Sequence, residues 1–211
     1  MTLGALQRGI EHLYAVDTGL DVDDFLVDDA ALPDESLRTR GETLLLREAE
    51  DGAAEVGLWV DATSLARLEA APARHWIGDD LLPDLCKAVE GVSHFVYLAY
   101  RALEERPVSL FDLELQAEVD KFAVAALLAR EDGGGSSEIA ALRVRLFEDA
   151  SFLDDERAEN GARYRRASRC AARLASRLED PISRASGRTQ TVDHLRRFYR
   201  LGAEEKVRFI G

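Results

Sequence analysis

The sequence predicts an α+β fold, which is a mostly α-helical bundle with a small N-terminal antiparallel β-sheet. Before Asp61 the apolar residues form short runs between turn-forming residues, whereas after Asp61 they recur every three to four positions, the helical period. The 211 residues, of which 46% are hydrophobic, suffice for one substantial core. We therefore expect a single domain over residues 1–211. Residues 1–61 would form a helix and the small sheet, and residues 62–211 the helical bundle.

The N-terminal part contains patterns for one helix and for three short strands. Apolar residues at helical spacing predict an amphipathic helix over residues 3–15. The stretch "DDFLVDD", residues 23–29, predicts a short strand. Residues 42–60 predict a hairpin because two apolar runs flank Asp51-Gly52, a pair suited to positive backbone dihedrals. Together these segments predict an antiparallel sheet near residues 24–60.

The sequence after Asp61 predicts further helices and no further strand. Ser109 is followed three residues later by Asp112, which is a variant of the capping box and predicts a helix start. The glycine-rich stretch "EDGGGSSE", residues 131–138, predicts a connector. The predicted helices cover residues 62–70, 81–105, 110–130, 138–149, 154–179 and 191–201, and "AEEKVRF" adds a terminal turn.

The formal net charge of -13 is divided unevenly along the chain. Residues 1–156 carry 13 basic and 34 acidic side chains, whereas residues 157–211 carry 14 and 6. The sequence shows no apolar run of membrane-spanning length and no secretion-signal pattern at its start. Cys86 and Cys170 stand alone on apolar helix faces, which predicts buried thiols in a reducing compartment. We expect a cytoplasmic protein without a membrane partner, and the 24 arginines against 3 lysines indicate GC-rich bacterial coding.

An arginine stripe lies on the predicted helix over residues 154–179, opposite its apolar face. At a rise of 1.5 Å per residue this stripe is about 18 Å long, a length that could follow a phosphate backbone. It contains no aromatic residue for base stacking, and the rest of the chain is acidic, so we expect no nucleic-acid partner. We expect the stripe to pair with acidic residues of 9–37, within the chain or between subunits. The stripe consists of Arg165, Arg166, Arg169, Arg173 and Arg177.

The two central helices carry polar residues between apolar faces. On the first, a core face is predicted at Leu85, Val89, Val92, Val96, Ala99 and Leu103. On the second, two apolar flanks enclose Glu114 and Glu118, so we expect both carboxylates to meet Lys121, Arg157, Arg163 or His94.

A metal site is an alternative interpretation of these polar residues, because helical bundles build carboxylate-rich sites from inward-facing side chains. The candidate ligands are Glu90, His94, Glu114 and Glu118. The Glu-x-x-His pairs of di-iron bundles are missing, and a Glu and a His four residues apart are typical of an ion pair on a helix. We expect a structural polar network and no cofactor, with a divalent metal as the alternative.

The sequence contains no recognisable catalytic motif. Arg188 and His194 fit a loose Arg-x(4 to 6)-His signature of helical ribonuclease domains, but 4 histidines and 24 arginines in 211 residues produce about one such match by chance. Thr191 is predicted to cap the helix that carries His194.

These observations predict a non-catalytic cytosolic accessory or interaction protein that binds another protein, or itself, through a charge-split helical bundle. Two alternatives remain open: a metal-binding helical-bundle enzyme or sensor, and a nucleic-acid binder or ribonuclease that uses the arginine-rich helix. An interaction protein should expose an apolar patch, a metal protein should bring the four candidate ligands together, and a nucleic-acid binder should present unpaired arginines.

Overall fold

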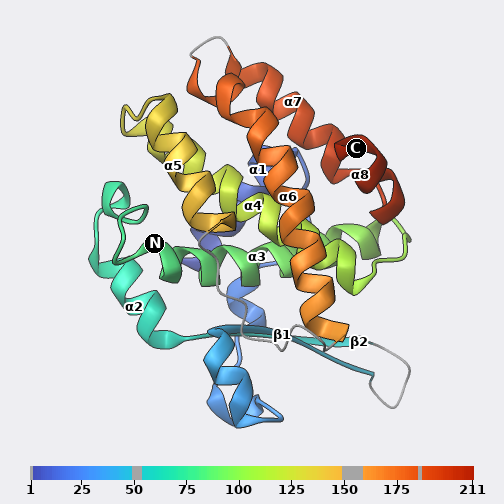
Figure 1. Ribbon diagram of the computed structural model, residues 1–211. Coiled ribbons are helices and arrows are strands. Elements are labelled where there is room, and N and C mark those ends of the chain that lie inside the picture. Colours follow the sequence, from blue (N-terminus) through green and yellow to red (C-terminus); the bar gives the residue numbers. More distant parts are fainter. Residues whose placement is uncertain (1, 49–53, 149–158, 185–186) are drawn as a thin grey trace.

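The computed structural model describes residues 2–48, 54–148, 159–184 and 187–211. Its helices form the bulk of the molecule, and a two-stranded sheet lies at one end, below α3 in Figure 1. This arrangement confirms the predicted fold class. The α-helices of the described residues are α1 (Leu3–Tyr14), α2 (Ala62–Ala70), α3 (Leu82–Leu103), α4 (Leu110–Glu131), α5 (Ser136–Phe147), α6 (Glu159–Ser183), α7 (Arg188–Tyr199) and α8 (Ala203–Ile210).

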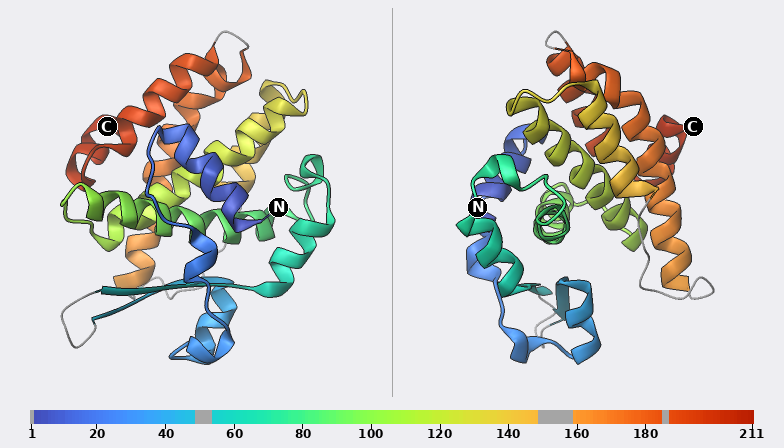
Figure 2. Two further views of the ribbon diagram at one scale, coloured as in Figure 1. Left: turned by 180° about the vertical axis from the view of Figure 1, so that it is seen from behind. Right: turned by 60° about the vertical axis from the view of Figure 1, so that its left-hand side comes forward.

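Helix α1 begins at a side-chain cap, because the hydroxyl of Thr2 accepts a hydrogen bond from the backbone of Ala5. It packs against α3 on the face of the molecule opposite α6, which Figure 2 shows from behind. Helices α3 and α4 therefore lie between α1 and α6.

The segment between α1 and the sheet differs from the predicted strand at residues 23–29. Three short 3-10 helices occupy it: η1 (Val22–Phe25), η2 (Asp29–Ala31) and η3 (Glu35–Arg40). Each is preceded by an aspartate whose side chain accepts a backbone hydrogen bond, a local bond that competes with strand pairing. The strand prediction was wrong here, and only Leu26 pairs with the sheet, through a single parallel bridge to Leu58.

The predicted hairpin is confirmed by strands β1 (Glu42–Glu48) and β2 (Ala54–Val60), which pair antiparallel with Leu45 opposite Gly57. The predicted turn at Asp51-Gly52 lies outside the described residues. One face of the hairpin contacts α3 where that helix carries Gly91. A Cβ at Gly91 would lie 3.1 Å from Leu58 Cδ1, so the glycine permits the close approach of helix and sheet.

Helix α4 is central to the bundle and packs against α3, α5 and α6. The capping box predicted at its start is present, because Ser109 and Asp112 bond each other's backbone N–H groups. The helix is buried on most sides, as expected from its two apolar flanks.

Helix boundaries elsewhere lie within four residues of the predicted ones where the structure describes them, and the predicted terminal turn is the helix α8. Helix α2 matches the predicted residues 62–70. Helix α7 begins at Arg188, so Thr191 lies inside it, buried, and does not cap it. Within the described residues, no helix is long and apolar enough to cross a membrane.

Candidate functional site

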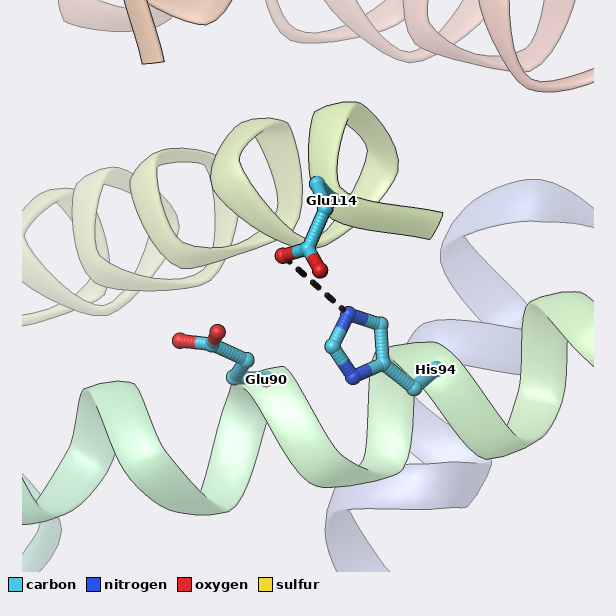
Figure 3. Close-up of side chains that lie close together, drawn as sticks. All are labelled: Glu90, His94 and Glu114. Atoms are coloured by element: carbon cyan, nitrogen blue, oxygen red, sulfur yellow. Dashed lines mark ion pairs between the residues drawn. The ribbon is translucent and has the colours of Figure 1, made fainter. Parts of the chain in front are cut away.

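A cluster of polar side chains lies where α3 faces α4. Helix α3 places Glu90 and His94 one turn apart, and α4 brings Glu114 toward them (Figure 3). One ligand atom from each of the three lies within 4.8 Å of the others. The closest contact between His94 and Glu114 joins Nε2 of the imidazole to Oε2 of the carboxylate at 3.9 Å. The structure therefore brings together three of the four candidate ligands.

A carboxylate from the sheet completes the surroundings of His94. Glu42, the first residue of β1, places Oε2 3.5 Å from Nδ1 of the imidazole. Only 7% of His94, 6% of Glu114 and 8% of Glu42 is exposed. Two atoms of this group, Nε2 of His94 and Oε2 of Glu42, are buried without a hydrogen-bond partner. Sequence analysis missed Glu42, because its approach depends on the docking of a distant hairpin.

The charges in the cluster hold a proton on the imidazole. Burial opposes the charged form of His94, but the nearby Glu42, Glu114 and Glu90 outweigh it and raise the pKa of His94 to about 9. Burial also raises the pKa of Glu114 to about 7, against the attraction of His94. Without a ligand, His94 is therefore a cation surrounded by the carboxyl groups of Glu42, Glu90 and Glu114.

The fourth candidate ligand, Glu118, pairs with Lys121, which also contacts Glu90 of the cluster. Nζ of Lys121 lies 2.6 Å from Oε1 of Glu118 and 2.9 Å from Oε2 of Glu90. The expected pairing of Glu118 with Lys121 and of Glu114 with His94 is thus formed. Arg157 lies outside the described residues.

A small pocket opens beside His94 and Glu114. Its volume is about 190 Å³, and its polar lining includes Arg40, Arg163 and Tyr164. Nη1 of Arg40 donates a 2.8 Å hydrogen bond to the hydroxyl of Tyr164, and the guanidinium of Arg163 lies 5.4 Å from the centre of the Tyr164 ring. The pocket gives the cluster a path toward solvent.

A second, larger hollow is apolar and lies between α3 and the hairpin. This apolar groove has a volume of about 750 Å³. Its lining comes from α3, from both strands and from the segment after α1: Thr18, Leu20, Phe25, Leu46, Arg47, Ala54, Val56, Phe95, Leu98, Ala99, Ala102 and Leu103. Figure 1 shows α3 and the hairpin running side by side.

The predicted core face of α3 was wrong at its C-terminal end, where the helix lines the apolar groove. Ala99 and Leu103 were predicted to lie in the core, but both line the groove, and Leu103 is 62% exposed. Leu46 and Leu20 at the groove are 53% and 43% exposed. Helical periodicity identified the apolar face of α3 correctly, but the chain itself covers only the part that precedes Leu98.

The arginine stripe on α6 makes contacts of several kinds. Arg166, Arg169, Arg173 and Arg177 form no ion pair with the described residues 9–37, and pairing between subunits stays a prediction. Arg166 instead lies over the ring of Phe111, 4.6 Å from its centre, and Arg177 donates to the backbone oxygens of Phe209 and Gly211. Arg169 and Arg173 are exposed.

Comparison with protein-family models, with curated proteins and with solved structures found no match for this chain.

The ribonuclease interpretation finds little support in α7. Arg188 pairs at 3.7 Å with Glu131, and the ring of His194 packs at 4.6 Å from that of Phe209. Burial and the nearby Arg197 lower the pKa of His194. Arg188 forms an exposed ion pair between α7 and α4, and His194 packs between α7 and α8.

A second buried polar network was missed by sequence analysis. Asp120 of α4 accepts hydrogen bonds from Tyr14 and Ser93, and Nζ of Lys206 donates to Gln116 at 2.8 Å. Lys206 has no exposed surface, and burial lowers its pKa to about 7. This network ties α8 to the centre of the bundle. A lysine in a short terminal segment carries no sequence signal of burial, so only the fold could reveal it.

Cys86 is an unreactive thiol. Burial raises its pKa to about 12, so the thiolate is not populated at neutral pH. Cys86 and Cys170 were predicted to be buried, but both are only partly buried.

Proposed function

We propose that this protein is a non-catalytic interaction protein, and that its apolar groove binds the apolar face of a basic amphipathic helix from a partner protein. The observation that carries the proposal is the groove itself, which leaves three leucines exposed around a floor of packed aromatic side chains. Phe25 and Phe95 meet in that floor with ring centres 4.9 Å apart. Exposed apolar surface of this kind is typical of a protein-binding site.

The shape of the groove favours a helical occupant. Its long wall is the second half of α3, and the opposite wall is the hairpin that runs beside that helix. The small residues Ala99 and Ala102 leave room in the α3 wall for leucine-sized side chains of a partner. Helix-in-groove recognition uses apolar anchors at positions i, i+3 or i+4, and i+7 of the bound helix.

The charge around the groove favours a basic occupant. Residues 9–37, which supply one end of the lining, contain no lysine or arginine. Four exposed aspartates flank Leu20 in this segment: Asp17, Asp21, Asp23 and Asp24. Glu104 and Glu105 follow Leu103 at the other end and are exposed too. Arg47, the one basic residue among the described residues of the lining, is paired with Glu55 across the hairpin. A partner with lysine or arginine beside its apolar face would be attracted to this rim.

A displayed library of random 20-residue peptides, selected on the intact protein at moderate salt, tests the proposal. We expect the enriched peptides to place leucine, isoleucine or phenylalanine at helical spacing with lysine or arginine beside them. Their affinity for a Leu46→Gln, Leu103→Gln double variant should fall by at least about tenfold, because both anchoring surfaces become polar. Leu110→Gln is the matched control, since Leu110 is 57% exposed but does not line the groove.

Three outcomes would overturn the proposal. These are a selection without enrichment, enriched peptides that are acidic, and enriched peptides that bind the double variant as well as the original protein. A second copy of the chain could also occupy the groove, and the molecular mass measured over a range of protein concentrations tests this. A dimer that is lost in the double variant would show that the groove binds a second copy and not a partner helix.

A further inference from the structure

We infer that Glu90, His94 and Glu114 form a binding site for one Zn²⁺ ion, with Glu42 as the residue that orients the histidine. The inference is independent of the apolar groove, which shares none of these residues. It begins with the convergence of three ligand atoms within 4.8 Å of one another, at the contact between two helices of the bundle.

An unpartnered nitrogen points to a missing ligand. His94 is more than nine-tenths buried, yet its Nε2 atom has no hydrogen-bond partner. Buried polar atoms are nearly always bonded, so such an atom calls for an explanation. Figure 3 shows Nε2 directed at the carboxylate of Glu114, into the space that the three ligands share. A metal ion in that space would accept its lone pair.

Glu42 gives the imidazole the arrangement that metal-binding histidines have. The second nitrogen of a metal-bound histidine usually donates its hydrogen to a carboxylate or a carbonyl, which fixes the tautomer. In this chain Nδ1 of His94 faces Oε2 of Glu42 at 3.5 Å, which leaves Nε2 for the metal. Because Glu42 begins a strand and the ligands lie on helices, this arrangement depends on the docked hairpin.

The charges around the three ligands match a divalent cation. Two carboxylates among the ligands neutralise one divalent ion when the imidazole is neutral. Lys121 contacts Oε2 of Glu90 at 2.9 Å, so the inferred ion would bind this residue through Oε1. Arg40 and Arg163 approach from the polar pocket, where Nη1 of Arg40 donates a hydrogen bond to the hydroxyl of Tyr164.

The ligand types select the metal. An imidazole with two carboxylates suits Zn²⁺, which binds three protein ligands and a water in its open sites, whereas Mg²⁺ and Ca²⁺ prefer oxygen ligands alone. Bonds of about 2.1 Å in a tetrahedral site place ligand atoms about 3.4 Å apart. The present separations would therefore close by about 1.4 Å at most, within reach of side-chain rotation. His94 and Glu114 also line the polar pocket, through which the ion can enter.

Calorimetric titration of the chelator-treated protein with Zn²⁺, and separately with Mg²⁺, tests the site. We expect one Zn²⁺ per chain with a dissociation constant in the micromolar range or below, a raised melting temperature, and no Mg²⁺ binding. His94→Gln and Glu114→Gln should each weaken Zn²⁺ binding by at least about 100-fold, and Glu42→Gln by about 10-fold to 100-fold, as for other residues that orient a ligand. Glu179→Gln is the matched control, because that carboxylate pairs with Arg143 and contacts none of the three ligands.

Zn²⁺ binding that is absent in the original protein, or equal in His94→Gln, would overturn the inference. The second result would assign the ion to the other histidines, His12, His75 and His194. Circular dichroism confirms that each variant is folded. The visible absorption of bound Co²⁺ provides a readout at the metal itself, and an identical spectrum in His94→Gln would contradict the proposed ligand set.

Discussion

Nε2 of His94 lies 3.9 Å from Oε2 of Glu114, at a helix contact where both side chains are buried. In the metal-free protein the proton on this imidazole is a source of stability. The pKa of His94 is raised to about 9 from the usual value near 6.5, so the folded state binds this proton more tightly than the unfolded state.

The contribution of His94 to the free energy of unfolding should be complete below about pH 6.5 and should disappear as the pH rises through about 9. Urea unfolding of chelator-treated original protein and of His94→Gln, at several pH values, measures the difference. We expect that difference to shrink by roughly 1 kcal/mol per pH unit within this window. A difference that is constant or grows with pH would contradict the assigned charge.

Lys206 should show the opposite dependence. Burial lowers its pKa to about 7, so the unfolded state binds the proton more tightly between about pH 7 and 10.5. The original protein should therefore gain stability relative to Lys206→Met as the pH rises from 7 to 9, by roughly 1 kcal/mol per pH unit. Urea unfolding of both proteins measures this gain, and an unchanged stability difference over the same range would show that Lys206 stays charged.

Lys121 should be more important for stability than either of its partners. Lys121→Met would leave Glu90 and Glu118 together without their shared cation, and we expect a loss of about 3 kcal/mol in the free energy of unfolding. Glu118→Ala should cost less, because Lys121 keeps its 2.9 Å contact with Glu90. Equal losses in the two variants would show that Lys121 depends on Glu118 alone.

Substitutions at the exposed rim of the apolar groove should change the stability of the protein little, whereas substitutions at its buried floor should lower it. Leu103→Gln should change the free energy of unfolding by no more than about 0.5 kcal/mol, because 62% of this residue is already exposed. Phe95→Ala should cost about 3 to 5 kcal/mol, because only 2% of Phe95 is exposed and its removal leaves a cavity. Chemical denaturation of both variants decides this, and a large loss in Leu103→Gln would place that residue in the core.

Local sequence patterns predicted the elements of this fold well. The helical period after Asp61 and the capping box at Ser109 and Asp112 depend on residues a few positions apart, which is the range that a pattern reports. The segment 23–29 was predicted wrongly because its aspartates bond the nearby backbone, and that bonding favours 3-10 turns over strand pairing.

The candidate sites could be predicted only in part. Glu90 and His94 lie one turn apart on a single helix, and Glu114 lies on the next helix, so helical periodicity identified them as candidates. Glu42 arrives from a hairpin whose docking no local pattern encodes. Leu103 lies on the apolar face of α3, but no other part of the described chain covers that end of the face. Periodicity identifies an apolar face and does not show which part of it is covered.

The most direct test of the proposed function is a nuclear magnetic resonance titration of the isotope-labelled protein with a selected basic amphipathic peptide. We expect the largest amide shifts at residues that line the groove, namely Leu98, Ala99, Ala102 and Leu103 of α3 and Val56 of β2. The same titration of the Leu46→Gln, Leu103→Gln variant should leave these amides unchanged. Shifts centred instead on the arginine stripe of α6, or no shifts at saturating peptide, would contradict binding in the groove.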